Sequence, residues 1–253
     1  MKSVILVLSL FIGMCQLITA KPHSWSYEGQ LGPENWGDLD PDYEIAKTGK
    51  RQSPIDLNAD SAITSQLARI EFNYEASPLS VVNNGHTFQV NNRSNSHILI
   101  EGQRYNLLQY HFHIPSEHTV EGEYYPMEMH FVHQNAAGEL AVVGVFLDEG
   151  LHNPVLQKAW DYLSAKEGTL NDPQTLINPI DLLPFQAKFA SMLVRYQYNG
   201  SLTTPPCSEG VLWLVLKKPI EVSKEQIDLF ESIFEMNARP VQPHNQRFLL
   251  ESK

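Results

Sequence analysis

Short apolar runs alternate with turn residues from residue 69 to residue 147, and this spacing constrains the fold more than any other feature of the chain. The runs have the length of single strands and lie too close together for helices between them, which disfavours a parallel sheet of βαβ units. Asn83-Asn84-Gly85 and Glu101-Gly102-Gln103 are typical of hairpin turns. We therefore predict an antiparallel meander with strands over residues 70–72, 79–82, 87–90, 97–100, 105–112, 127–133 and 140–147.

The rest of the chain is expected to add a few elements around this sheet. Residues 154–165 and 223–236 carry apolar side chains at helical spacing, and Ser223 with Gln226 fits a capping box. The other predicted segments are an irregular arm over residues 23–42, one or two helical turns over 60–67, a connection over 178–183, and strands over 191–197 and 211–216. No repeat or linker divides the chain, so we predict a single α+β, predominantly β domain over residues 21–253.

Residues 1–20 are expected to be a cleavable signal peptide. Lys2 precedes an apolar run from Val4 to Ile12, and small residues end at Ala20. The run is too short to span a membrane, and no later segment has about 20 continuous apolar residues. The residues before Cys15 make a poor lipoprotein signal, which disfavours a lipid anchor there. We expect an exported protein, periplasmic or secreted, that has no membrane span and is a monomer or homodimer.

The charge of the chain excludes one class of partner. The 253 residues include 29 acidic and 18 basic side chains, which gives a net charge of −11 at pH 7. Phosphate backbones and anionic lipids repel such a protein, so neither nucleic acid nor a membrane surface is an expected partner. Small neutral substrates fit this charge. Cleavage at Ala20 would leave Cys207 as the only thiol, so no disulfide is expected within the chain.

Three histidines fall on facing positions of two predicted strands. Side chains alternate along a strand, so His111 and His113 share a face, and His130 can meet them from the next strand. Three imidazoles with one open position suit a catalytic zinc, whereas a structural zinc takes a fourth protein ligand, usually cysteine. Gln109 and Glu128 each stand two residues before a ligand, where they can accept from its free ring N–H. The sequence therefore predicts a Zn²⁺ site.

A second metal motif is weighed against this one. His111-x-His113 followed by Glu117 resembles the first half of a cupin motif, which implies iron or manganese and oxygenase-like chemistry. Tyr124 stands where the cupin motif needs a glycine, so the zinc site is the better prediction. Two other histidines fall out of phase with the facing positions and are predicted to be structural, namely His118 and His133.

Ordered motifs along the mature chain resemble those of the α-class carbonic anhydrases, in particular the exported bacterial type. The motifs cover residues 25–27, 32–37, 51–56, 83–86, 111–113, 116–119, 128–130, 201–207 and 237–240. The resemblance implies a large twisted, mostly antiparallel sheet with short peripheral helices and a conical cavity that contains zinc. It also implies reversible hydration of carbon dioxide to bicarbonate and a proton, by attack of zinc-bound hydroxide on CO2.

The resemblance also implies a role for individual residues. His111, His113 and His130 match the zinc ligands, and Asn237 joins Gln109 and Glu128 among the residues behind them. The catalytic positions are Glu117 and Thr203, which orient the hydroxide, and His86, the proton shuttle. The substrate side of the cavity is matched by Val132, Val142, Leu202, Val211 and Trp213, together with Thr204 at its border, and the polar side by Tyr27, Asn84 and Gln89.

The chain departs from the family pattern at one position. Many exported relatives carry a cysteine that pairs with the one after Pro205-Pro206, and here Ala46 takes its place. Cys207 is then expected to be a free thiol or to pair between molecules, with lower heat tolerance. A binding protein with a decayed site is the competing hypothesis. Such relatives lose a zinc histidine, and all three are present here.

Overall fold

The computed structural model describes residues 24–163, 182–191 and 194–252. The predicted signal peptide and the end of the helix predicted over 154–165 lie outside these residues. Within the described ranges, no helix is long and apolar enough to cross a membrane.

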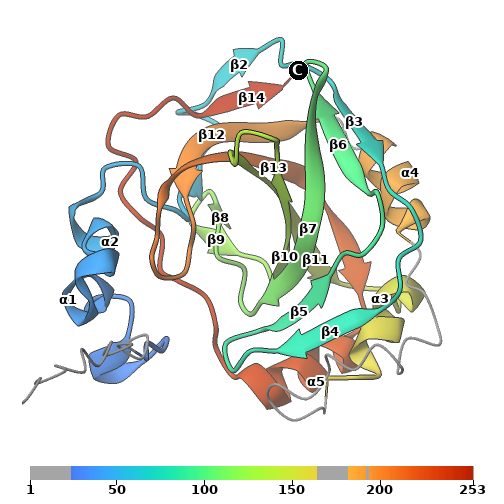
Figure 1. The fold of residues 1–253 in the computed structure, drawn as a ribbon, viewed down its shortest axis with the longest axis horizontal. Helices are drawn as coiled ribbons and strands as arrows, with labels where there is room; N and C mark the ends of the chain where they lie inside the picture. Colours follow the sequence, from blue (N-terminus) through green and yellow to red (C-terminus); the bar gives the residue numbers. More distant parts are fainter. Residues whose placement is uncertain (1–23, 164–181, 192–193, 253) are drawn as a thin grey trace, which may run out of the picture.

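A large twisted sheet dominates the described part of the chain (Figure 1). Its eleven described strands run in the order β2-β14-β12-β13-β11-β10-β7-β5-β4, and β6 pairs with β7 and β3; β1, β8 and β9 form a small second sheet. The strands are β1 Asp56–Leu57, β2 Ile63–Ser65, β3 Ile70–Asn73, β4 Ser80–Asn83, β5 Phe88–Asn91, β6 His97–Ile100, β7 Gln103–His113, β8 Thr119–Val120, β9 Glu123–Tyr124, β10 Met127–Gln134, β11 Leu140–Glu149, β12 Arg195–Ser201, β13 Glu209–Val222 and β14 Leu250–Ser252.

Most neighbouring strands are antiparallel, which confirms the predicted sheet. The hairpin between β6 and β7 has the expected two-residue turn, with positive φ at both Glu101 and Gly102. Two pairs in the large sheet are parallel, however: β11 with β13 and β14 with β2. These pairs join strands that are far apart in sequence, so the short spacing between residues 69 and 147 could not reveal them.

Two local predictions were wrong. Residues 60–67 contain the strand β2 rather than helical turns, because Ile63 N donates to Leu249 O at 2.8 Å and the segment pairs with β14. Residue 191 ends helix α4, and the predicted strand over 191–197 begins only at Arg195. In both places pairing or packing with distant residues outweighs a weak local pattern.

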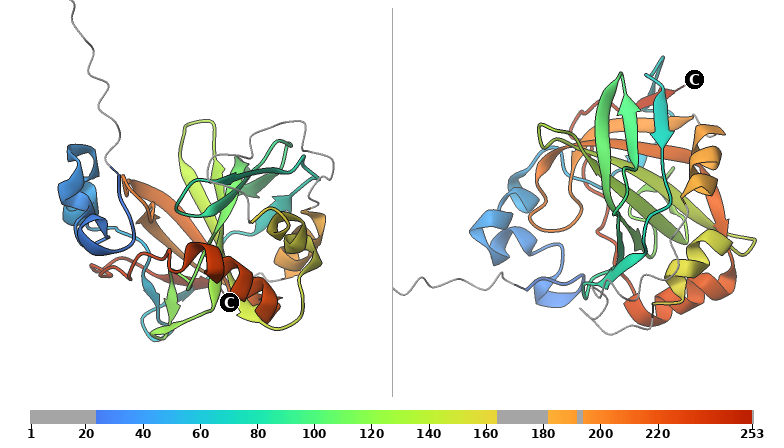
Figure 2. Two further views of the ribbon diagram at one scale, coloured as in Figure 1. Left: turned by 90° about the horizontal axis from the view of Figure 1, so that it is seen from below. Right: turned by 45° about the vertical axis from the view of Figure 1, so that its right-hand side comes forward.

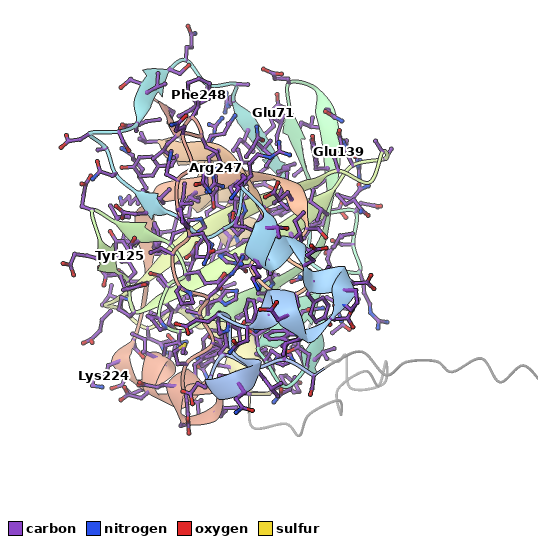
Figure 3. The ribbon with its side chains drawn as sticks, turned by 90° about the vertical axis from the view of Figure 1, so that its left-hand side faces the viewer. Glu71, Tyr125, Glu139, Lys224, Arg247 and Phe248 are labelled. Atoms are coloured by element: carbon purple, nitrogen blue, oxygen red, sulfur yellow. The ribbon has the colours of Figure 1, made fainter. Side chains whose placement is uncertain are left out.

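Short helices lie around the sheet, as predicted. They are η1 Gly29–Leu31, α1 Trp36–Leu39, η2 Pro41–Tyr43, α2 Ile45–Thr48, α3 Pro154–Trp160, α4 Leu183–Ser191 and α5 Lys224–Phe234. The capping box of Ser223 and Gln226 is confirmed at the start of α5. Helices α3, α4 and α5 lie on one side of the molecule, and the N-terminal arm with α1 and α2 lies on the other (Figure 2). Figure 3 looks onto the arm, which lies in front of the sheet.

Side chains alternate along the central strands, so the two faces of the sheet carry different residues. On β10, Met129 and Phe131 are buried in the larger apolar cluster, to which α3, α4 and α5 also contribute. The intervening residues Glu128, His130 and Val132 face the other way. The strand β7 alternates in the same way, with Tyr110 and Phe112 in that core. The side of the sheet away from these helices is therefore where the candidate site lies.

Cys207 is a free thiol, as predicted, and its side chain is fully buried. Burial raises its pKa to about 11, so little of it is the reactive thiolate at neutral pH. A bond from Cys207 to a second molecule does not fit this burial, because its sulfur does not reach the surface.

His133 is buried in the core beside a change of register in β10. Its Nε2 lies 3.0 Å from the hydroxyl of Tyr74, and the two rings stack. Burial lowers the pKa of His133 from its ordinary value of 6.5 to about 3. The folded protein thus keeps this imidazole neutral where the unfolded chain would protonate it. The stabilisation is complete above pH 6.5 and is lost as the pH falls toward 3.

We predict that His133→Gln reduces the acid sensitivity of the fold. Between pH 7.5 and 5.0, His133 accounts for ~2 kcal/mol of the loss in unfolding free energy, because only the unfolded state gains its proton. Urea unfolding of each variant at both pH values measures this difference. The exposed His152 serves as control, since His152→Gln should leave the loss unchanged. An equal loss in His133→Gln and in the unmodified protein would contradict the prediction.

Candidate metal centre

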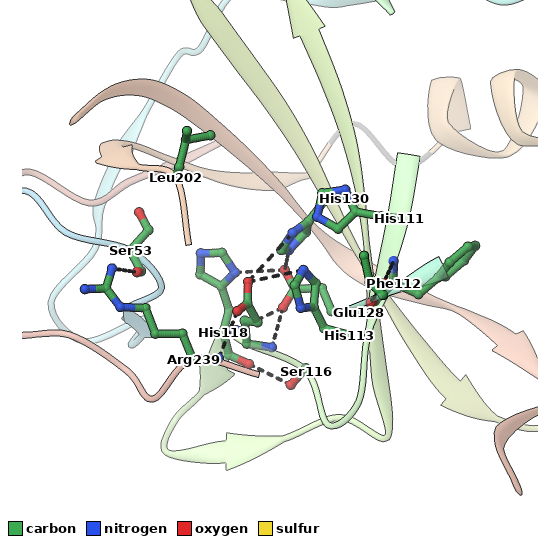
Figure 4. Close-up of polar contacts among 12 residues, drawn as sticks. Ser53, His111, Phe112, His113, Ser116, His118, Glu128, His130, Leu202 and Arg239 are labelled. Carbon is green, nitrogen blue, oxygen red and sulfur yellow. Dashed lines mark hydrogen bonds and ion pairs between the residues drawn. The ribbon is translucent and has the colours of Figure 1, made fainter. Parts of the chain in front are cut away.

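Three histidine side chains converge where β7 and β10 lie side by side. His111 is directly opposite His130, and His113 is opposite Glu128 in the same antiparallel pair. One ring nitrogen from each of the three histidines lies within 4.8 Å of the other two. His113 and His130 are buried, whereas His111 is partly exposed. Figure 4 shows the three rings together with Glu128 and His118.

Each ring has an acceptor at the nitrogen that faces away from the other rings. His111 Nδ1 lies 2.9 Å from Gln109 Oε1, and His113 Nδ1 lies 2.8 Å from the backbone oxygen of Asn237. His130 Nε2 lies 3.0 Å from Glu128 Oε1. Because these acceptors hold a proton on the outer nitrogens, the inner nitrogens present lone pairs to a common point.

Two of the three imidazoles, those of His111 and His113, bind a proton less readily than an ordinary histidine. Burial lowers the pKa of His111 well below its usual range, and the neighbouring His113 and His130 lower it further. Burial likewise lowers the pKa of His113. Its inner nitrogen, Nε2, has no hydrogen-bond partner among the described residues. Three imidazole nitrogens, with no fourth His or Cys ligand grouped with them among the described residues, fit a catalytic zinc.

Glu128 carries a buried negative charge behind His130. Its Oε1 also lies 2.8 Å from Nδ1 of His118, and its Oε2 accepts from the backbone N–H groups of Glu117 and His118, both at 2.9 Å. Burial alone would raise the pKa of Glu128, but the charges and hydrogen bonds of His118 and His130 hold it well below its usual range. The carboxylate therefore stays ionised and favours the Nε2–H form of His130.

His118 was predicted to be structural, and its partners make it part of the surroundings of the centre. Its Nε2 lies 2.7 Å from the Tyr198 hydroxyl, which lies 2.9 Å from Ser53 Oγ. The phase of the strands gave no sign of this, because His118 lies in the loop before β8. Its link to Glu128 depends on how that loop folds back over β10.

Glu117 lies beside the inner nitrogens of His113 and His130. Its Oε2 is 3.5 Å from His113 Nε2 and 3.8 Å from His130 Nδ1, and it has no hydrogen-bond partner within the described ranges. Its Oε1 accepts from the backbone N–H of Arg239 at 2.9 Å. A hydrogen bond from Thr203 to Glu117, expected from the paired roles of these residues, is therefore not formed at Oε2. Thr203 itself is buried, with 5% of its surface exposed.

The polar residues predicted around the centre line one cavity of about 110 Å³. Its lining includes Tyr27, Asn84, His86, Gln89, Gln109, His111, His113 and Thr204, and also Trp25 and Thr87, which were not predicted. The imidazole of His86 stacks on the indole of Trp25, with ring centres 3.7 Å apart. A partly exposed histidine thus shares a cavity with two of the proposed metal ligands.

The predicted apolar residues gather on neighbouring strands. Val132, Val142 and Trp213 are in register across β10, β11 and β13. They share a buried cluster with Val211, and Leu202 packs against that cluster. The indole of Trp213 meets the ring of His130 edge-on, with centres 4.8 Å apart. An apolar wall therefore adjoins the His130 side of the centre.

Comparisons with known proteins agree on one family. The sequence profile described as eukaryotic-type carbonic anhydrase matches residues 31–253. A carbonic anhydrase from Nostoc sp. is 44% identical over 92% of this chain and 88% of its own length. Another from Pectobacterium carotovorum is 38% identical over 97% of this chain and 98% of its own. The solved α-carbonic anhydrase of Thermovibrio ammonificans, in complex with sulfanilamide, is 43% identical and has a TM-score of 0.82, covering 91% of this chain and 100% of its own.

We predict that Glu128→Gln weakens zinc binding by ~10–100-fold, because the amide removes the charge that supports His130 and turns N–H groups toward existing donors. Competition with a chromophoric chelator measures the dissociation constant. The exposed Glu123 on β9 provides the matched control, and Glu123→Gln should bind zinc as the unmodified protein does. An unchanged zinc affinity in folded Glu128→Gln would show that the carboxylate serves only the stability of the fold.

Proposed function

Because the chain belongs to the eukaryotic-type, or α-class, carbonic anhydrase family, we propose that it hydrates carbon dioxide reversibly at a zinc ion held by His111, His113 and His130. The observation that carries this proposal is the convergence of three imidazoles, each with an oxygen acceptor near its other nitrogen, beside a cavity. This geometry supports an active enzyme over a binding protein with a decayed site.

In the proposed reaction, the metal would supply the nucleophile and the surrounding side chains would orient it. A zinc ion with three histidine ligands supplies a hydroxide nucleophile near neutral pH, a property already known for carbonic anhydrases and taken from them here. Thr203 and Glu117 are proposed to orient this nucleophile. The Glu117 carboxylate lies next to the proposed ligand nitrogens, and its Oε2 is available as an acceptor. It can therefore accept a hydrogen bond from the Thr203 hydroxyl once the two side chains meet. Thr203 would then act only as an acceptor toward the nucleophile and aim its lone pair.

The apolar wall is the proposed site for the substrate. Carbon dioxide is small and has no net charge, so Val132, Val142 and Trp213 can hold it beside the centre without competing for the metal. Leu202 and Val211 extend this wall, and Thr204 is proposed to mark its border with the polar side. The substrate thus approaches from the apolar side while water and protons use the polar side.

His86 is the proposed proton shuttle. A histidine with a pKa of about 6.5 can accept a proton and release it to buffer near neutral pH. His86 is partly exposed, lines the same cavity as His111 and His113, and is connected to them through a lining of polar side chains. Tyr27, Asn84 and Gln89 are proposed to order the water that carries the proton across this cavity.

The proposed setting is outside the cytoplasm. The apolar stretch near the start of the chain, after Lys2 and ending in small residues, supports export to the periplasm or the medium. The mature protein would be one domain over residues 21–253, acting as a monomer or homodimer on carbon dioxide and bicarbonate.

We predict that CO2 hydration depends on zinc and on His111. In stopped-flow assays, a strong chelator or His111→Ala should each lower the rate by at least ~100-fold, since two ligands leave the metal poorly held. His152→Ala, which changes an exposed histidine, is the control and should keep full activity. Metal analysis should find zinc. Bound iron or manganese would favour an oxygenase, and activity indifferent to both treatments would reject the mechanism.

We predict that His86→Ala slows turnover mainly in weak buffer. Without the shuttle, kcat should fall by ~10-fold or more at low buffer concentration, and added imidazole should restore it by carrying the proton itself. The ratio kcat/KM should change little, because proton export follows the release of bicarbonate. Loss of equal size at every buffer concentration would argue against a shuttle at this position.

A further inference from the structure

The side-chain amide of Asn237 connects the turn that carries His86 to the strand β7. Asn237 follows helix α5 and is 2% exposed. Its Nδ2 donates to the backbone oxygens of His86 at 2.9 Å and of Phe112 at 3.0 Å, and its Oδ1 accepts from the backbone N–H of Ile114 at 2.7 Å. Both amide hydrogens are in use, so the orientation of the side chain is fixed.

The backbone of Asn237 is bonded to the same stretch of β7. Its N–H donates to Ile114 O at 3.0 Å, and its oxygen accepts from His113 Nδ1 at 2.8 Å. The residue therefore contacts a proposed metal ligand and both of that ligand's neighbours in sequence. Only the side chain extends the connection to His86.

The turn that carries His86 is held together from within. Asn84 Oδ1 accepts from the backbone N–H groups of His86 at 3.0 Å and Thr87 at 2.9 Å. A second connection to β7 runs from Thr87 Oγ1, which donates to Phe112 O at 2.5 Å. Because these bonds hold the turn together, the bond from Asn237 to the His86 carbonyl helps to set the position of the His86 ring.

We propose that the Asn237 side chain is a positioning residue for proton transfer, which holds the His86 turn at a fixed place relative to the metal ligands. The inference rests on the proposed shuttle role of His86. Truncating the side chain would leave the backbone bond to His113 and the Thr87 bond in place. The backbone bonds of Asn237 to His113 and Ile114 would then still support the metal ligands, while the turn would lose its connection through the Asn237 side chain.

The test uses Asn237→Ala in the zinc-loaded enzyme, with Asn237→Ser as a smaller change should the first variant fold poorly. In weak buffer kcat should fall by at least ~5-fold, because small displacements of a reacting group are costly, while kcat/KM stays within ~2-fold. Added imidazole should restore kcat, and zinc content should stay at one ion per chain. A parallel loss of kcat and kcat/KM, or a loss of zinc, would overturn the proposal.

A second readout does not depend on activity. The His86 ring stacks on Trp25, so its C–H protons should show ring-current shifts in NMR spectra, assigned by their absence in His86→Ala. In Asn237→Ala these shifts should shrink or the signals broaden. Gln226→Ala is the matched control, because Gln226 is another buried amide, bonded to Asn153 and Ser223 far from the cavity. It should lower stability without moving the His86 signals or the weak-buffer kcat.

A double-mutant cycle separates this proposal from the one it rests on. If His86→Ala does not change kcat in weak buffer, the shuttle itself is wrong. If His86→Ala slows weak-buffer turnover, adding Asn237→Ala should cause no further loss, since the positioned group is already absent. Additive losses would overturn the role of Asn237 while leaving His86 as the shuttle.

Discussion

The buried charge of Glu128 is the constraint on which the centre depends. A carboxylate removed from water is costly unless its charge is compensated. Here His118 and two backbone N–H groups form hydrogen bonds with it, and His130 Nε2 lies at an ion-pair distance of 3.0 Å. Meeting this requirement fixes the loop before β8 and the ring of His130 together. It also explains Gly144, opposite His130 on β11, where a Cβ would come within 3.0 Å of Glu128 Oε1. The ionised Glu128 side chain thus fixes the orientation of the His130 ring and requires a residue without a Cβ at position 144.

Side chains alternate between the two faces of β7 and β10, and the buried face anchors the strands that carry Glu128 and the three histidines. Phe112 and Phe131 pack into the core on one face, against residues from α3, α4 and α5, while the three histidines project from the other. A site on central strands is held more precisely than one on loops. The side chains of His86 and Thr203 lie outside these two strands, on connections between strands.

Period-two patterns made the convergence of His111, His113 and His130 predictable, because register between adjacent strands follows from which face must be buried. The contacts of Gln109 and Glu128 with these rings were predictable for the same reason, since each stands two residues before one of the histidines on the same face. The link from His118 to Glu128 and the four contacts of Asn237 were not, because they join segments through loop geometry that no local period records. The parallel pairing of β11 with β13 escaped prediction for a related reason, as helices and β12 intervene in the chain.

Arg239 accounts for how the Glu117 side of the centre stays in place without the disulfide typical of exported relatives. Its guanidinium donates to Gln52 Oε1, Ser53 O and the backbone oxygen of Ala46, and Gln52 Nε2 in turn donates to the backbone oxygen of Cys207. These bonds join the segments that the disulfide would join, and a hydrogen bond from a charged group such as the guanidinium adds about 1.5–3 kcal/mol. A disulfide also restricts the unfolded chain and hydrogen bonds do not, so its loss lowers stability. The position of Glu117 itself follows from the backbone N–H of Arg239, which the missing disulfide leaves unchanged.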